Sequence, residues 1–202
     1  MRTEAPAGGQ AAGASCRPQG RGAAGGGDAA LAQWSAWDRG CMALAIAAAR
    51  EAAAEGEVPV GAVLARDGRV IAIAHNRRES LGDPTAHAEV LAVREAARVV
   101  GGWRLDGVTI YVTLEPCPMC AGALWLARVE RLVFAAPDAR AGAAGSVYNV
   151  ASDARLNHRL RVEAGLEEEA ARALLRAFFR DLRSRPRAGW AGERRSEGCP
   201  SG

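Results

Sequence analysis

The sequence predicts one α/β domain whose central sheet is partly parallel. Short apolar runs typical of strands alternate with longer runs typical of helices, and strands separated by helices are characteristic of α/β layers. The chain has 202 residues, of which 49% are hydrophobic and 24% are charged, as in ordinary globular proteins. A single domain accounts for this length, because domains commonly contain roughly 100–200 residues.

The first half of the pattern predicts one helix and one hairpin. Asp38 is a favourable N-cap, and Gly56 and Pro59 end the helix that it would start. Asp67-Gly68 is a typical hairpin turn between two apolar runs. The elements expected in this half are a helix over residues 38–55, strands over residues 60–65 and 69–74, and a polar loop over residues 75–84.

The second half predicts three helices and two further strands. Apolar side chains recur at helical spacing between Val90 and Val100, whereas the two strands are short and continuously apolar. A Gly-rich loop separates the second of these strands from the last helix. The expected elements are helices over residues 85–99, 117–127 and 166–183, and strands over residues 108–114 and 132–135.

The composition of the two ends predicts that both are disordered, on either side of a folded domain at residues 34–183. Residues 1–33 are rich in Gly and Ala and contain one large aliphatic residue, Leu31, so they bury too little to offset the entropy of ordering. Residues 184–202 form a basic tail with repeated Gly and Pro. No apolar run is long enough to cross a bilayer, and no signal-peptide pattern is present. We therefore expect a cytoplasmic protein that does not contact membranes.

The composition excludes several classes of enzyme. All 26 basic residues are arginine. Without lysine the chain cannot form a Schiff base, and it lacks the lysine of a phosphate-binding loop or of a protein kinase. Five cysteines, an odd number, do not indicate a disulfide framework. Paired cysteines in a cytoplasmic protein more often hold a metal.

Two short segments carry most of the chemical information. They are Pro84-Thr85-Ala86-His87-Ala88-Glu89 and Glu115-Pro116-Cys117-Pro118-Met119-Cys120. Cys117 and Cys120 share one face of a helix, and a helix N-terminus favours the thiolate that binds metal. With His87 they offer one nitrogen and two sulfurs, a ligand set suited to zinc. The other Cys and His residues are scattered, so the fourth position is expected to stay open for water, as in catalytic sites.

Glu89 is the expected base beside this site. Two thiolates cancel the charge of zinc, so a nearby base would help to activate water. On a regular helix Glu89 would point about 200° away from His87, and it lines the same pocket only if the metal lies over the helix N-terminus. Taken alone, the two residues are better explained as a capping glutamate and a packed histidine. Together with the cysteine pair they predict zinc-dependent hydrolysis.

A His-x-Glu motif followed by Pro-Cys-x-x-Cys is the signature of the zinc nucleobase deaminases. Residues 35–183 closely resemble the bacterial tRNA-specific adenosine deaminases within that group. The matching stretches are residues 58–63, Asn76, residues 83–89, residues 109–123 (TIYVTLEPCPMCAGA), Asp138, residues 142–146 (GAAGS) and Asn157-His158-Arg159. Cytosine, guanine and cytidylate deaminases share the signature, so the tRNA assignment depends mainly on the last two stretches.

The resemblance implies a three-layer α/β/α fold of the cytidine-deaminase type with a mixed central sheet. It also implies a homodimer with one Zn²⁺ per subunit, held by His87, Cys117 and Cys120. The implied substrate is the flipped-out wobble adenosine in the anticodon stem-loop of an arginine tRNA, and the product is inosine. Glu89 would be the catalytic proton shuttle between the attacking water, the ring nitrogen and the departing amine.

The resemblance implies substrate contacts as well. Asn76 matches an asparagine that hydrogen-bonds the flipped nucleotide, and Asp138 matches a position near the RNA backbone. Val60 and Leu114 would form walls of the base pocket. On the bare sequence, these residues are equally well explained as a turn-stabilising asparagine, a loop carboxylate and two core side chains.

The last predicted helix indicates contacts to RNA. Its arginines recur at helical spacing and two phenylalanines lie among them: Arg172, Arg176, Phe178, Phe179, Arg180 and Arg183. Unpaired RNA is commonly held by charges on its backbone and by rings stacked on its bases. Phe178 and Arg180 are therefore expected to contact the substrate. The alternative is a solvated arginine face with the phenylalanines in the core.

Two other functions stay open at this point. A deaminase of free bases would share the zinc signature, but it would have no obvious use for the arginine face or the GAAGS loop. A protein that binds RNA or a dimer partner on an inactive zinc scaffold would have no need for Glu89.

Overall fold

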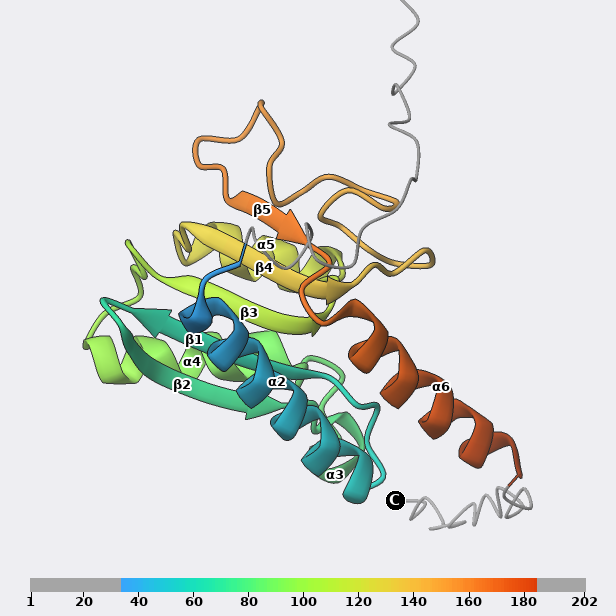
Figure 1. The fold of residues 1–202 in the computed structure, drawn as a ribbon. Helices are drawn as coiled ribbons and strands as arrows, with labels where there is room; N and C mark the ends of the chain where they lie inside the picture. The colour runs from blue at the N-terminus through green and yellow to red at the C-terminus, as the bar shows by residue number, and fades with distance from the viewer. Residues whose placement is uncertain (1–33, 185–202) are drawn as a thin grey trace, which may run out of the picture. The chain divides into compact units, whose positions relative to one another are not determined.

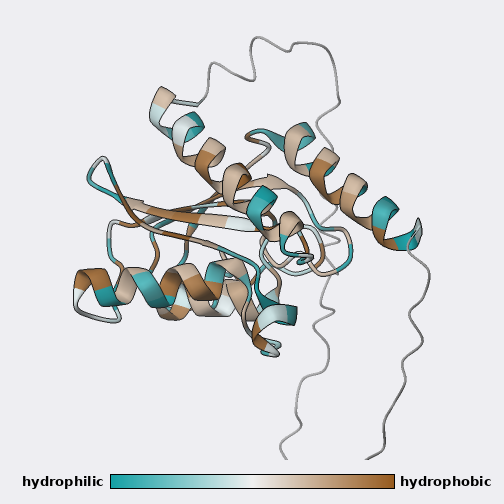
Figure 2. Cartoon of the chain, turned by 90° about the horizontal axis from the view of Figure 1, so that it is seen from below, coloured by the Kyte–Doolittle hydropathy of each residue, from teal (hydrophilic) through white to brown (hydrophobic). Residues whose placement is uncertain are grey.

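The computed structural model describes residues 34–184. In chain order its elements are α2 (Ala36–Ala54), β1 (Gly61–Arg66), β2 (Arg69–His75), α3 (Arg78–Leu81), α4 (Ala88–Val100), β3 (Thr109–Leu114), α5 (Pro118–Leu126), β4 (Arg131–Ala136), β5 (Arg161–Ala164) and α6 (Glu168–Ser184). The strands form one sheet in the order β2-β1-β3-β4-β5. Helices α2 and α6 cover one face of this sheet, and α4 and α5 cover the other (Figures 1 and 2).

The sheet is mixed, so the predicted three-layer α/β/α architecture is confirmed. β1 pairs antiparallel with both β2 and β3, whereas β3, β4 and β5 run parallel. The predicted hairpin is present, and its turn residues Asp67 and Gly68 have φ angles of 51° and 69°. Positive φ at both central residues gives a turn whose twist matches that of the paired strands. β5, at the edge of the sheet, was not expected from the sequence.

Two apolar cores lie on the two faces of the sheet. Under α4 and α5, the core contains the alternate strand residues Leu64, Ile110 and Leu132 together with Ala92 and Leu124. Under α2 and α6, the core contains the intervening strand residues, among them Val63, Tyr111 and Val133, with Met42 and Ile46 of α2. Because successive side chains of a strand point to opposite faces of the sheet, each of these strands contributes to both cores. A sheet covered by helices on both faces requires this.

Asp38 does not start α2, contrary to the prediction. The N-cap is Ser35, and Asp38 is the third helical residue, whose carboxylate accepts hydrogen bonds from the Ser35 backbone N–H and hydroxyl. This capping box leaves the other Asp38 oxygen to accept from Tyr111 Oη at 2.8 Å and from Arg131 Nη1 at 2.6 Å. Burial would raise the pKa of Asp38, but these bonds hold it well below its usual value.

Other helix ends differ from the predictions at the places where motifs begin. α4 starts at Ala88 rather than at residue 85, and α5 starts at Pro118 rather than at Cys117. The predicted loop over residues 75–84 contains the short helix α3. α6 ends at Ser184, and the predictions for residues 1–33 and 185–202 lie outside the described residues. Within the described part, no helix is long and apolar enough to cross a membrane.

Candidate active site

Two helix N-termini bring the predicted metal ligands together. His87 is the N-cap of α4 and Cys117 is the N-cap of α5, both with extended backbone, and Cys120 lies in the first turn of α5. β3 ends three residues before Cys117, so the site lies at the carboxyl end of a central strand. This is the usual position of ligand sites in open α/β sheets. Neither N-cap side chain caps its own helix, which leaves both side chains available as ligands.

The geometry of these side chains fits zinc. His87 Nδ1 lies 3.5 Å from Cys120 Sγ and 3.7 Å from Cys117 Sγ. Tetrahedral zinc, with Zn–N near 2.0 Å and Zn–S near 2.3 Å, holds nitrogen and sulfur ligands about 3.6 Å apart. Within residues 34–184, these three residues are the one cluster of three or more side chains suited to a metal. The structure therefore brings the three predicted zinc ligands together.

The electrostatics of Cys117 also favour metal binding, whereas the hydrogen bond to Cys117 and burial raise the pKa of Cys120. Hydrogen bonds from the Cys120 side chain and from the His87 ring lower the pKa of Cys117 to about 4. Cys117 is therefore a thiolate at neutral pH, the form that coordinates metal. Cys120 is fully buried beneath the site.

Glu89 lines the same cavity because His87 is not part of the helix. The expected 200° separation assumed that both residues were helical, but the extended backbone of His87 turns its side chain toward the N-terminus of α4. The Glu89 side chain is 4% exposed, and this burial raises its pKa. A carboxyl group with a raised pKa takes up a proton more readily at neutral pH than an exposed one does.

A cavity of about 180 Å³ lies over the ligands. It brings together side chains from five separate segments: Val60, Asn76, His87, Glu89, Leu114, Cys117 and Asp138. Every predicted substrate-binding residue outside the last helix therefore lines one cavity with two of the metal ligands, His87 and Cys117. Val58, Arg78, Glu115 and Ala141 complete the lining and were not predicted.

A wider groove of about 860 Å³ adjoins this cavity and shares Val58, Leu114 and Asp138 with it. Its basic lining comes from α6 and the residues after β4: Arg140, Arg172, Arg176, Arg180 and Arg183. Some of these arginines are paired with acids, as Arg172 is with Glu168 at 2.6 Å. The predicted arginine face of the last helix therefore forms one wall of the groove.

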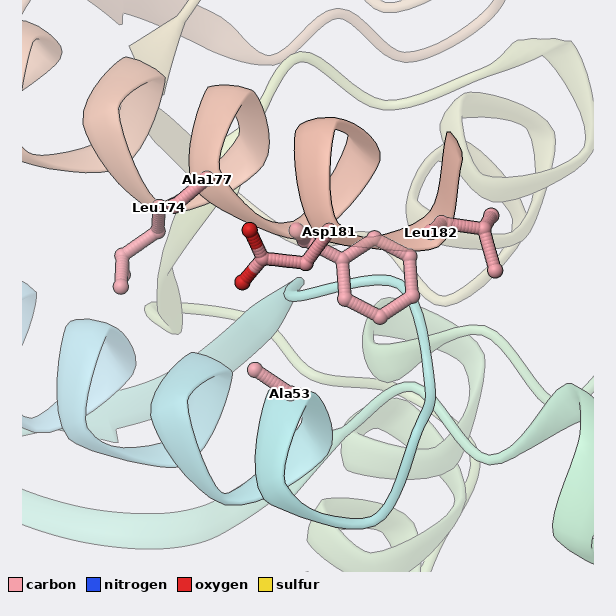
Figure 3. Close-up of a pocket in the computed structure, with 6 residues that line it drawn as sticks. Ala53, Leu174, Ala177, Asp181 and Leu182 are labelled. Carbon is pink, nitrogen blue, oxygen red and sulfur yellow. The ribbon is translucent and has the colours of Figure 1, made fainter. Parts of the chain in front are cut away.

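Phe178 does not take part in either space. It lines a separate hollow of about 150 Å³ between α2 and α6, with Ala53 and Leu174 (Figure 3). Its neighbour Phe179 is 40% exposed and lines the basic groove instead. α6 therefore places Phe178 beside α2, and its predicted contact with the substrate stays a prediction.

Glu57 is a buried residue of the site that the sequence did not reveal. It follows α2 and is fully inaccessible to solvent. Its carboxylate accepts hydrogen bonds from Asn76 Nδ2 at 3.1 Å and from the backbone N–H groups of Glu79 at 3.2 Å and Ser80 at 2.8 Å. Burial would raise the pKa of Glu57, but the hydrogen bonds from Ser80 and Glu79 lower it below the usual value.

Glu115 is a second buried carboxylate of the site, and it lines the cavity itself. Its carboxylate accepts from the backbone N–H groups of Asp138, Ala144 and Ser146 at 2.9–3.0 Å, and from the Ser146 hydroxyl. Burial would raise the pKa of Glu115, but these bonds lower it. Gly142 is required beside this carboxylate, because a Cβ there would lie 2.3 Å from Glu115 Oε2. The GAAGS loop is therefore wrapped around Glu115.

One sequence signal could have indicated both glutamates. Glu57 and Glu115 each adjoin a continuously apolar stretch, where an acidic residue is buried only when it is paired. Most of their partners are backbone N–H groups, which leave no mark in the sequence.

The fold and the ligands together define a zinc-dependent deaminase. Residues 35–136 match the family model of the cytidine and deoxycytidylate deaminase zinc-binding region. The matched segment begins at the N-cap of α2 and ends at the last residue of β4, and it includes all three ligands.

Comparison with relatives narrows the family. The chain is 50% identical to the tRNA-specific adenosine deaminase of Bacillus subtilis over 147 residues, which cover 73% of this chain and 91% of the relative. A solved structure from a study of A-to-I editing by tRNA A34 deaminases gives a TM-score of 0.65 at 45% identity, over 67% of this chain and 99% of that one. The protein therefore belongs to the family of tRNA-specific adenosine deaminases.

Guanine deaminases share the fold at lower identity. The enzyme from Nitrosomonas europaea gives a TM-score of 0.58 at 26% identity, over 69% of this chain and 83% of that one. The fold is therefore common to enzymes of different substrates, and the substrate must be argued from the surroundings of the cavity.

Proposed function

We propose that this protein hydrolyses the wobble adenosine in the anticodon of an arginine tRNA to inosine and ammonia. The observation that carries the proposal is the continuity of a small cavity over the zinc ligands with a much larger groove lined by arginines. A free base needs only the cavity. A flipped nucleotide in an RNA loop also needs a basic surface beside it for the backbone.

Glu89 is assigned the proton transfers. His87, Cys117 and Cys120 would hold zinc, which when bound would act as a Lewis acid and make a water molecule more acidic. Glu89 accepts one proton of the attacking water and delivers it to N1 of adenine as the C6–O bond forms. It then moves the second proton from this oxygen to the amino group, and the C6–N bond breaks to release ammonia. Glu89 returns to its starting state, and the products are inosine and ammonia.

The other lining residues would hold the nucleotide. Asn76 is assigned a hydrogen bond to the flipped nucleotide, and Val60 and Leu114 are assigned the apolar walls against the base. Asp138 lines both the cavity and the groove, which supports a place near the RNA backbone where the nucleotide leaves the strand. Arg180 lies in the groove and would contact phosphate there.

The homodimer is a further part of this proposal. Large apolar side chains are exposed in the layer formed by α4, α5 and the residues that follow α4, among them Val99, Trp103 and Leu126 at 58–61% exposure. Side chains of this kind favour a protein interface over free solvent. Light scattering of the purified protein in solution measures this directly, and a monomer at micromolar concentration would contradict the proposal.

A tRNA substrate would also place the enzyme in the cytoplasm.

The function is tested with the zinc-loaded protein and an arginine tRNA transcript. We expect the wobble adenosine to be sequenced as guanosine after incubation, while adenosines elsewhere in the transcript stay unchanged. The matched control is the same transcript with guanosine at the wobble position. Unchanged RNA together with ammonia release from free guanine or cytosine would replace this function with that of a free-base deaminase.

A further inference from the structure

Glu57 has no part in the proton transfers assigned above, yet it is fully buried beside the cavity. We propose that Glu57 is a positioning residue that acts through Asn76: it binds Nδ2 of the side-chain amide, so that Oδ1 is the atom offered to the nucleotide. The inference rests on the proposed function only in its kinetic consequence, because the contact itself is a property of the free protein.

The orientation of the amide follows from the chemistry of its neighbour. An ionised carboxylate only accepts hydrogen bonds, so the Asn76 atom 3.1 Å from Glu57 Oε2 must be the NH₂ group. Asn76 is itself 5% exposed and lines the cavity. With one N–H of its NH₂ group bound to Glu57, Asn76 offers Oδ1 to the cavity as an acceptor. Its partner on the nucleotide is then a donor, such as a ribose hydroxyl.

The same carboxylate also holds the chain segment that carries Asn76. α3 has no side-chain cap of its own at Arg77, and Glu57 accepts from the second and third helical N–H groups, those of Glu79 and Ser80. This is the hydrogen bonding of an N-cap, supplied by a residue from the loop before β1. The segment from residue 76 to residue 80 is thus fixed at both ends by one side chain, and Arg78 within it lines the cavity.

Glu57→Gln tests whether these donors require a carboxylate. Glutamine keeps the shape but has one acceptor oxygen, so it cannot satisfy Asn76, Glu79 and Ser80 together. We expect kcat/KM for the anticodon stem-loop to fall about tenfold or more, the scale of a lost hydrogen bond to a charged group. Bound zinc should stay at one per subunit. The matched control is Glu55→Gln two residues earlier, where an exposed carboxylate lies 3.8 Å from His75 and no loss is expected.

A double-mutant cycle shows whether Glu57 acts through Asn76. In an Asn76→Ala background, Glu57→Gln should lower kcat/KM by less than about twofold, because the group that it positions is already absent. Losses that multiply fully would overturn the proposal, since Glu57 would then act on the reaction by another route. An unchanged kcat/KM in the single variant would overturn it equally.

The contact can also be observed in the unaltered protein, whether or not it acts on tRNA. In ¹⁵N-labelled protein at neutral pH, the side-chain NH₂ protons of Asn76, assigned by their loss in Asn76→Ala, should exchange slowly with water. Fast exchange at these protons would contradict the proposal, even if Glu57→Gln fails to fold. Slow exchange in a protein that leaves every tested RNA unchanged would refute the proposed function and preserve the positioning role.

Discussion

Glu89 and Glu115 line the same cavity, and both are buried, with exposures of 4% and 2%. Their surroundings differ in the supply of hydrogen-bond donors. Glu115 accepts from three backbone N–H groups and one hydroxyl, whereas the hydrogen bonds that favour ionised Glu89 come from its own backbone N–H and from Cys120. The pKa of Glu115 is accordingly lowered and that of Glu89 is raised by burial.

The number of donors around a buried carboxyl group therefore decides what it can do. A carboxylate held by several donors stays ionised and fixes the chain around it, as Glu115 does for the GAAGS loop and Glu57 does for α3. A carboxyl group with few donors can gain and lose a proton during a reaction. We therefore expect substitution of Glu89 and substitution of the loop-holding carboxylates to have different consequences.

The largest effect is expected at Glu89. Glu89→Gln removes the proton shuttle, so single-turnover deamination of the stem-loop should slow by about 10²–10⁴-fold. Bound zinc and the unfolding temperature should stay close to those of the parent, because Glu89 anchors no loop. A variant that retains the parent rate would show that another group carries the protons.

Glu115→Gln is expected to act on stability first. A glutamine cannot satisfy all four donors, so the free energy of unfolding in urea should fall by about 1.5–3 kcal/mol. Deamination should decrease less than in the Glu89 variant. If the stability of Glu115→Gln equals that of the parent, the hydrogen bonds to the GAAGS loop contribute nothing and the comparison fails.

Gly142→Ala disturbs the same Glu115 carboxylate from the side of the GAAGS loop. The added Cβ would lie 2.3 Å from Glu115 Oε2, so the carboxylate or the loop must shift. We expect a loss of about 1–3 kcal/mol in urea unfolding, the usual cost of overpacking. Gly122→Ala in α5 is the matched control, because no atom lies within 4 Å of its added Cβ and alanine favours a helix. Equal losses in the two variants would refute the close contact.

The pH dependence of stability should distinguish Glu115 from a neutral anchor. Its pKa is lowered on folding, so its contribution is complete above its unfolded pKa near 4.5 and disappears as the pH falls through the folded value. The difference in unfolding free energy between the parent and Glu115→Gln should therefore be largest near pH 7 and should shrink below about pH 4.5. A difference that grows toward acid pH would contradict this sign.

The smallest effect is expected outside the cavity, at Arg180. Arg180→Ala removes one cation of the groove, so binding of the stem-loop should weaken severalfold. The slope of log Kd against the logarithm of the salt concentration should decrease by about one, the value for one phosphate contact. Binding measured by fluorescence anisotropy at several salt concentrations tests this. The rate at saturating RNA should not change. A large change in that rate would show that Arg180 acts on the reacting base rather than on RNA binding.

The sequence predicted the features that depend on local patterns. The Asp67-Gly68 turn, the alternation of strands and helices, and the spacing of Cys117 and Cys120 are all set by residues close together in the chain. β5 was missed because it has four residues and no fully buried side chain to mark it as a strand. The start of α4 was misplaced because His87 has none of the usual N-cap chemistry.

The residues that act over long separations could not be predicted in the same way. Glu115 holds a loop some thirty residues away and Glu57 holds Asn76, and both depend mainly on backbone donors that no side chain reveals. Phe178 was expected at the substrate because it lies among arginines in the sequence. The rotation of α6 against α2 determines its position instead, and this rotation is a tertiary property.

The most direct test of this account compares the parent and Glu89→Gln on one substrate. Both proteins, at equal bound zinc, are incubated with the anticodon stem-loop of an arginine tRNA, and the wobble position is sequenced over time. The account predicts conversion of adenosine to inosine by the parent and a rate at least about 10²-fold lower for the variant. No conversion by the parent, or equal conversion by both, would contradict it.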